Sequence, residues 1–150
     1  MQFYVDGSFD DDKHISSYGV IVVNNNNKVI DILYNICTNE EYLKHRNVYG
    51  EVLGTLCAIK YAQINNIKNI EIFHDYIGIC KWCLGLSNVS NIGKSWKQNY
   101  SLSKNYRQYI SQCGINITFN KVKSHSGNKY NDMADKYAKK AIKEYVPSQH

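Results

Sequence analysis

The sequence predicts an α/β fold in which a mixed five-stranded sheet is flanked by helices, with the elements in the order β-β-β-α-β-α-α-β-α. Three observations carry this prediction. Short segments alternate apolar with polar residues, as half-buried strands do; longer segments repeat apolar residues at helical spacing; and turn-forming Gly, Asn and Ser residues separate them. The 150 residues can bury one core, so we expect a single domain over residues 1–150.

The first half of the chain is expected to open with an antiparallel meander. Three strands are predicted, at residues 1–5, 18–23 and 28–36. Four consecutive asparagines, 24–27, join the last two strands. A helix over 48–64 follows, with a buried stripe made of Val48, Val52, Leu56 and Ile59. A fourth strand at 69–74 alternates apolar and polar residues and leads to Asp75 in the next turn.

The second half is expected to be mainly helical. Residues 76–84 are predicted as a short helix and 85–99 as a surface excursion rich in Gly, Ser and Asn. The next helix, 101–113, ends at Gly114; its apolar side consists of Leu102, Tyr106, Tyr109, Ile110 and Cys113. A fifth strand is predicted at 115–122. A last helix begins near Asn131 and directs four residues toward the core: Ala134, Ala138, Ala141 and Ile142.

Cysteine usage and hydropathy indicate the compartment. The five cysteines are odd in number, and Cys57 and Cys113 fall on apolar helical faces, as small buried thiols do in a reducing cell. The N-terminus lacks the pattern of a secretory leader, and no apolar run approaches membrane-spanning length. We therefore expect a cytoplasmic, monomeric protein with no membrane association and no organic cofactor.

Charge is divided unevenly along the chain. Residues 1–75 hold six Lys and Arg against ten Asp and Glu, whereas residues 76–150 hold twelve against three. The basic residues of the second half include Lys94, Lys97, Lys136, Lys139, Lys140 and Lys143. Aromatic residues, Trp82 and Trp96 among them, lie between the basic ones. Such a mixture is typical of a nucleic-acid surface, although an ordinary solvated Lys-rich face has the same composition.

Four acids occupy positions from which carboxylates can converge on metal ions. Asp6 is expected at the end of the first strand, Glu51 near the start of a helix, Asp75 after the fourth strand and Asp135 in the last helix. Hard divalent cations take several oxygen ligands, and crowded carboxylates are unfavourable without a cation. The sequence therefore predicts a metal-dependent nuclease.

Each acid also has a structural interpretation. Asp6 precedes Gly7 as a turn residue would, Glu51 would be favoured by the dipole at a helix start, and Asp75 could cap the following helix. Asp132 lies three residues before Asp135 on nearly the same helical face and competes with it. Only the joint pattern favours a metal site.

The order of elements and the local motifs resemble ribonuclease H type 1, particularly some bacterial members, over essentially the whole chain. The motifs are Asp6-Gly7-Ser8, Asn47-Val48-Tyr49-Gly50-Glu51, Phe73-His74-Asp75-Tyr76, Val122-Lys123-Ser124-His125-Ser126-Gly127 and Asn131-Asp132-Met133-Ala134-Asp135. Each motif alone is common, but their order and placement are specific. The resemblance implies the ribonuclease H-like fold and favours Asp135 over Asp132.

The resemblance also implies an activity. The protein would be an endonuclease that hydrolyses the RNA strand of RNA/DNA hybrids and leaves a 5′-phosphate and a 3′-hydroxyl. Two Mg²⁺ ions about 4 Å apart, with Mn²⁺ as a possible substitute, would activate the water and stabilise the leaving oxygen. Asp6 would bridge both ions, Glu51 and Asp75 would complete the first site, and Asp135 would hold the second. His125 would assist proton transfer or product departure.

Contacts with the hybrid are also implied by the resemblance. Gly7, Ser8 and Asn47 would read the minor groove and the ribose 2′-hydroxyl, which distinguishes RNA from DNA. A basic, aromatic excursion would hold the DNA strand through Trp82, Lys94, Trp96 and Lys97. Two positions depart from many relatives: Val48 replaces an Asn and Ile77 replaces a Gln. Discrimination of the hybrid could therefore be looser or rest on other side chains.

Two alternative functions remain open. A catalytically silent hybrid-binding module would share the basic surface, but silent copies usually lose an acid and all four are present here. Another nuclease of the same fold, such as a transposase or integrase core, would share the acids but normally needs more chain.

Overall fold

The computed structural model describes residues 1–76, 79, 101–123 and 127–146. Its strands are β1 (Gln2–Asp10), β2 (Ile15–Val23), β3 (Val29–Cys37), β4 (Asn69–His74) and β5 (Asn116–Lys121). Its helices are η1 (Leu43–His45), α1 (Asn47–Ile64), α3 (Ser101–Gln112) and α4 (Lys129–Glu144). The predicted helix at 76–84 and the excursion at 85–99 lie outside the described residues, apart from Tyr76 and Ile79.

The strands form the predicted mixed five-stranded sheet, with the order β3-β2-β1-β4-β5. The meander β1-β2-β3 is antiparallel, while β4 pairs in parallel with both β1 and β5. Parallel neighbours need a connection that crosses back to the other end of the sheet; α3 lies in the connection from β4 to β5, and α1 leads from the meander into β4. This arrangement places β1 at the centre of the sheet.

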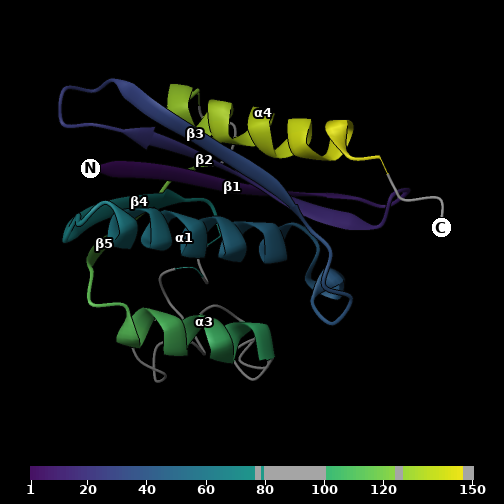
Figure 1. The fold of residues 1–150 in the computed structure, drawn as a ribbon. Coiled ribbons are helices and arrows are strands. Elements are labelled where there is room, and N and C mark those ends of the chain that lie inside the picture. Colours follow the sequence, from purple (N-terminus) through teal and green to yellow (C-terminus); the bar gives the residue numbers. More distant parts are fainter. Residues whose placement is uncertain (77–78, 80–100, 124–126, 147–150) are drawn as a thin grey trace.

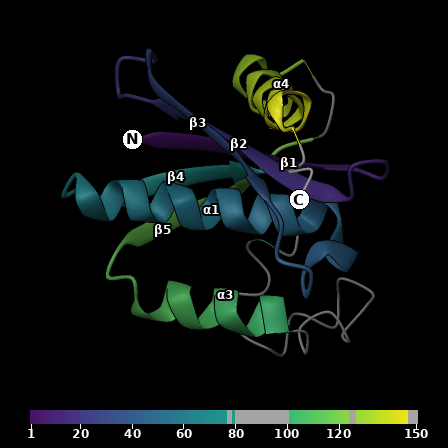
Figure 2. The same ribbon diagram turned by 45° about the vertical axis from the view of Figure 1, so that its right-hand side comes forward.

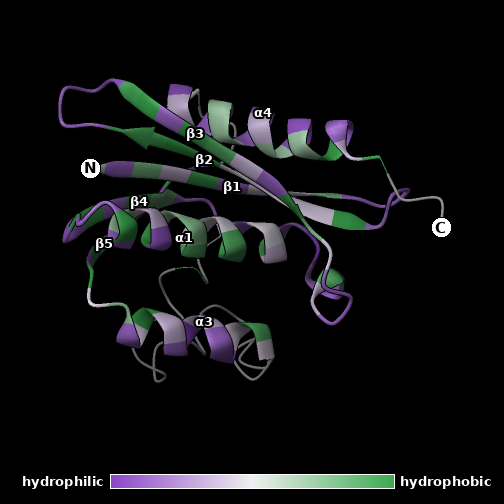
Figure 3. Cartoon of the chain, viewed as in Figure 1, coloured by the Kyte–Doolittle hydropathy of each residue, from purple (hydrophilic) through white to green (hydrophobic). Residues whose placement is uncertain are grey.

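Helices cover both faces of the sheet (Figures 1 and 2). The helix α4 lies across β1 and β2 on one face, and α1 lies against β1 and β2 on the other, with α3 beside it. Figure 3 shows hydrophobic and hydrophilic residues alternating along α3 and α4, as expected for helices with one buried side. Among the residues that the structure describes, no helix is long and apolar enough to cross a membrane.

The core follows from the alternation of side chains along β1. Phe3 and Val5 point toward α1 and pack with its Ala58 and Ile59. Tyr4 points to the opposite face and packs against Ala134 of α4. Residues beyond Val5 continue this alternation, so Asp6 belongs to the α4 side of β1 and Gly7 to the α1 side.

Several sequence predictions need correction. The first strand extends to Asp10 rather than ending at residue 5, because its pairing with β2 continues to Asp10 opposite Ile15. Asp6 therefore lies within a strand and not at its end. Tyr109 is 36% exposed rather than buried on the apolar side of α3. The last helix starts at Lys129, where the Asn128 side chain accepts hydrogen bonds from the backbone N–H groups of Tyr130 and Asn131.

Candidate active site

Asp6 and Asp75 lie next to each other because of the register between two parallel strands. The pairing of β1 with β4 joins Phe3 to Ile72 and Tyr4 to Phe73. Continued by two residues, this register brings Asp6 opposite Asp75 at the same edge of the sheet. The strand β4 ends at His74, so Asp75 is the first residue of the following turn.

Glu51 reaches this edge from α1, and glycines allow the helix to approach the sheet closely. A Cβ atom on Gly7 would come closer than 3.0 Å to the backbone oxygen of Asn47 and the backbone nitrogen of Glu51. A Cβ atom on Gly50 would collide with the Ser17 carbonyl group on β2. Any larger side chain at these two positions would push the start of α1, and Glu51 with it, away from β1.

The Glu51 carboxylate is held by the turn that carries Asp75. Glu51 is only 3% exposed. Its Oε1 accepts a hydrogen bond of 2.7 Å from the Asp75 backbone N–H, and its Oε2 accepts one of 3.2 Å from the Tyr76 N–H. These bonds fix the position of Asp75 relative to Glu51. The interpretation of Glu51 as a charge placed only to suit the helix dipole does not account for them.

Asp135 approaches Asp6 from the opposite face of the sheet. Asp6 pairs with Gly19 on β2, and a Cβ atom on Gly19 would come closer than 3.0 Å to backbone atoms of Ala134 and Ala138. The missing side chain lets α4 lie directly on the sheet beside Asp6. A Ser17 Oγ hydrogen bond to the Ala138 carbonyl oxygen, 2.5 Å long, fastens the helix there.

The pKa shifts of Asp6 and Glu51 reflect both the burial of these acids and the charges of their acidic neighbours. Burial, reinforced by the neighbouring charges of Asp135 and Asp75, raises the pKa of Asp6 to about 7, although the Gly7 N–H hydrogen bond opposes the shift. Burial, with contributions from Asp6 and Asp75, raises the pKa of Glu51 to about 8 despite its two backbone N–H donors. All four acids therefore interact in one cluster.

The chemistry of this cluster suits a hard cation. All its donors are carboxylate oxygens, which Mg²⁺ and Mn²⁺ prefer to bind. Burial, with a contribution from the neighbouring negative charges, raises the pKa of Asp6 and of Glu51. Among the described residues, Lys139 forms an ion pair with the cluster: its Nζ lies 3.0 Å from Asp135 Oδ2, one turn along α4. Within the described residues, no three of the acids are close enough together to form a ready-made metal site.

The last helix separates the two competing acids. Asp135 is partly buried and is a direct electrostatic neighbour of Asp6. Asp132 is exposed in the first turn of α4. The structure thus brings Asp135, and not Asp132, to the carboxylate cluster.

The remaining predicted residues divide into two groups. Ser8 follows Asp6 on β1 and is partly buried, and Asn47 is the exposed first residue of α1, so both lie beside the cluster. Five others lie outside the described residues: His125, Trp82, Lys94, Trp96 and Lys97.

Two contributors were missed from sequence. His74 is fully buried and shapes the turn that carries Asp75, because its Nδ1 donates to the Tyr76 carbonyl oxygen at 3.0 Å. Burial lowers its pKa to about 4, so the ring is neutral. Lys139 was counted only as one of several surface lysines. Its spacing of four residues from Asp135 was the available signal, since such pairs meet on a helix.

The chain matches known proteins in sequence pattern and in structure. A family model described as RNase H matches residues 1–143. No curated protein sequence matches the chain.

Solved structures show the same fold at low identity. RNase H1 from the archaeon Halobacterium salinarum is 14% identical with a TM-score of 0.66, over 96% of this chain and 98% of that one. A compost-derived RNase H1 in complex with an RNA/DNA hybrid is 12% identical with a TM-score of 0.61, over 94% and 98%. The protease–reverse transcriptase of prototype foamy virus is 18% identical with a TM-score of 0.67, over 98% of this chain but 21% of that one.

The family model covers nearly the whole chain, and the sheet, the flanking helices and the four carboxylates lie within its span. The protein therefore belongs to the RNase H family.

Proposed function

We propose that this protein is an endonuclease that hydrolyses the RNA strand of RNA/DNA hybrids with two divalent metal ions. The observation that carries the proposal is the carboxylate cluster, where three different elements and one turn bring acids together, and where burial, reinforced by the neighbouring carboxylates, raises the pKa of Asp6 to about 7 and that of Glu51 to about 8. A purely structural set of acids would be destabilised by burying these carboxylates together, whereas a bound cation would neutralise their charge.

The residues divide naturally between two ions. Asp6 interacts with Asp135 on one side and with Asp75 on the other, so it is the group suited to bridge both ions. Glu51 and Asp75, tied together by the 2.7 Å hydrogen bond, would complete the first site, and Asp135 would hold the second. Bound Mg²⁺, or Mn²⁺ in its place, would activate the attacking water and stabilise the leaving 3′-oxygen, giving 5′-phosphate and 3′-hydroxyl ends.

The chain's own groups position the substrate around this cluster. We propose that Gly7, Ser8 and Asn47 contact the ribose 2′-hydroxyl groups, since all three border the cluster and 2′-hydroxyls are what distinguish the RNA strand. The basic residues Lys94 and Lys97, with Trp82 and Trp96, would hold the DNA strand. His125 would move a proton or aid product departure.

We further propose that residues 1–150 form a monomeric, cytoplasmic catalytic domain that needs no organic cofactor. The RNase H1 that was solved with an RNA/DNA hybrid supports the choice of substrate. A silent hybrid-binding module is the alternative, and the intact carboxylate cluster argues against it.

The test is direct. Labelled RNA/DNA hybrid, RNA/RNA duplex and DNA/DNA duplex are incubated with the protein in Mg²⁺, and products are resolved by length and end chemistry. We expect cleavage of the hybrid only, and only within the RNA strand. Comparable cleavage of DNA duplex would indicate a general nuclease, and binding of the hybrid without any cleavage would indicate the silent module.

Variants connect the activity to the site. Asp75→Asn and Asp135→Asn should each abolish cleavage, because an amide keeps the shape but removes a negative ligand. Asp132→Asn is the matched control from the same helix, exposed to solvent, and should retain most activity. The reverse ranking of the two α4 variants would show that the wrong acid was assigned to the site.

A further inference from the structure

A cleft of about 510 Å³ lies between the β1–β2 hairpin and the C-terminal half of α4. Its lining includes Ser8, Asp10, Lys13, Lys139 and Lys143. Three lysines against one aspartate make the cleft cationic. None of the hybrid contacts proposed above uses these three lysines.

The cleft continues directly from the carboxylate cluster. Along β1, Asp6, Ser8 and Asp10 alternate onto the side that faces α4. Along α4, Asp135, Lys139 and Lys143 follow at four-residue intervals, each about one turn of 5.4 Å farther on. The two series run side by side, so the surface changes from acidic at Asp6 to basic at Lys143.

One of the three lysines of the cleft, Lys13, is held in place by hydrogen bonds to the backbone. Lys13 Nζ donates to the carbonyl oxygens of Ile142 at 2.7 Å and Tyr145 at 3.1 Å, which ties the hairpin to the last turn of α4. Asp10 is occupied in turn, because its Oδ1 accepts a hydrogen bond from the Lys13 backbone N–H. Lys143 forms no ion pair with any residue that the structure describes, so its ammonium group can serve a ligand.

We propose that this cleft binds a backbone phosphate of the RNA strand next to the scissile phosphate, with Lys143 as its cationic ligand and Ser8 as a hydroxyl donor. This inference rests on the proposed function. The RNA strand is the occupant because the cleft is continuous with Asp6, over which the strand to be cut must lie. Lysine ammonium groups are ordinary phosphate ligands in nucleic-acid interfaces.

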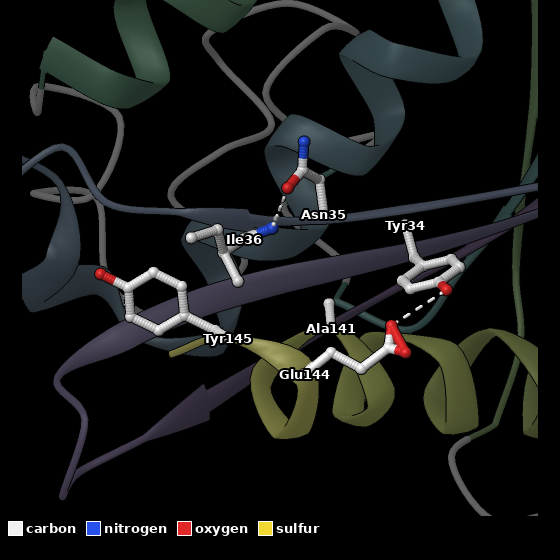
Figure 4. A pocket seen from close by; sticks show the side chains of 6 residues that line it. All are labelled: Tyr34, Asn35, Ile36, Ala141, Glu144 and Tyr145. Atoms are coloured by element: carbon white, nitrogen blue, oxygen red, sulfur yellow. Dashed lines mark hydrogen bonds between the residues drawn. The ribbon is translucent and has the colours of Figure 1, made fainter. Parts of the chain in front are cut away.

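Two further cavities along α4, formed by residues that the structure describes, suit this role less well, one because of its chemistry and the other because of its position. The cavity of about 230 Å³ between β3 and α4 has no lysine in its lining, and its Glu144 carboxylate accepts a hydrogen bond from the Tyr34 hydroxyl (Figure 4). It would repel a phosphate. The other is lined by Lys136, Lys139, Lys140, Lys143 and Glu144, with no residue of β1. Lys140 there lies over the rings of Tyr34 and Tyr137, away from the carboxylate cluster.

Lys140 therefore offers a matched control for Lys143. Both lysines are on the same helix, and Gln at either position removes one positive charge, but only Lys143 lines the cleft. Binding of fluorescent hybrid is measured in EDTA, which prevents cleavage, at a series of salt concentrations. Lys143→Gln should flatten the log–log salt dependence by up to about 0.9, as expected for one lost phosphate contact, and Lys143→Arg should restore it. Equal flattening by Lys140→Gln, or none by Lys143→Gln, would overturn the proposal.

A second measurement locates the phosphate. Single neutral methylphosphonates are placed at successive positions of the RNA strand, and in parallel of the DNA strand. Wild-type protein should bind the hybrid more weakly when the methylphosphonate replaces one RNA phosphate beside the scissile bond. The Lys143→Gln variant should be insensitive to that same methylphosphonate, whereas the Lys140→Gln variant should remain sensitive to it. Coupling of Lys143 to a DNA phosphate, or to no phosphate, would overturn the assignment.

The two proposals can fail separately. Cleavage of unmodified hybrid by the wild type in Mg²⁺ tests the proposed function alone. A protein that does not cut the hybrid, yet shows Lys143 coupled to one RNA phosphate, would refute the nuclease activity and keep the cleft. A protein that cuts the hybrid without such coupling would refute only the cleft.

Discussion

Removing the charge of Asp6 should stabilise the metal-free protein while destroying its activity. The acid is buried beside Asp135 and Asp75, and its pKa is raised from 3.8 to about 7. Between these values the folded chain holds a proton that the unfolded chain has released. The free energy of unfolding must therefore fall as pH rises from about 4 to about 7, and the loss is complete above pH 7.

The magnitude follows from the two pKa values. At 1.36 kcal/mol per pKa unit, the difference between 3.8 and about 7 corresponds to about 4 kcal/mol at pH 8. Two effects reduce the gain from Asp6→Asn: Glu51 titrates in the same cluster, and the Asn amide weakens the hydrogen bond from the Gly7 N–H. We therefore expect the variant to recover about half of the lost free energy of unfolding, about 2 kcal/mol. In a chain of this length, that gain raises Tm by about 4–8 °C.

The assay is thermal unfolding in EDTA at pH 8 and at pH 4, followed by circular dichroism. Asp6→Asn should melt higher than the wild type at pH 8 and at nearly the same temperature at pH 4, where the folded chain holds the Asp6 proton and the unfolded chain is close to its own midpoint, so that little of the penalty is present. Exposed Asp132→Asn is the control and should change neither value. A variant that is less stable than the wild type at pH 8, or equally stabilised at both pH values, would refute the inference that the Asp6 carboxylate is buried unfavourably beside other carboxylates.

Three further outcomes are expected. Gly19→Ala should force α4 off the sheet and cost about 1–3 kcal/mol, with loss of hybrid cleavage. Gly54→Ala, whose Cβ would meet side-chain atoms of Tyr18 and Val20 and no backbone, should be milder, and equal effects of the two variants would contradict this. Lys139→Gln should tighten Mn²⁺ binding in calorimetry, because the ammonium group 3.0 Å from Asp135 then no longer competes; weaker binding would show that the lysine supports the site. Asn128→Ala should lower Tm by about 2–4 °C by removing the cap of α4, and an unchanged melting curve would show that the cap contributes little.

The sequence by itself determined the order of the strands and helices that the structure describes, and the family. The strand at 69–74 was predicted with the boundaries that it has, and α1 and α3 differ from their predictions by one residue at one end. Local signals suffice there, because alternation, helical spacing and a stop at Gly114, whose φ is +72°, are all encoded within a few residues. The set of four acids was also readable from motifs.

Only the tertiary structure decided how those acids meet. The first strand was predicted to end too early because Asp6-Gly7-Ser8 has the composition of a turn. Pairing with β2 keeps these residues extended, and this pairing leaves no signal in the local sequence. The proximity of Asp6 to Asp75 depends on a register in which the paired residues are 69 positions apart in the sequence, as Phe3 and Ile72 are. Gly7 and Gly19 carry no chemistry, yet they set the distances of α1 and α4 from β1. Because they lack a Cβ atom, they let backbone segments that are far apart in the sequence come into contact. No local sequence pattern shows which segments will meet in the folded chain.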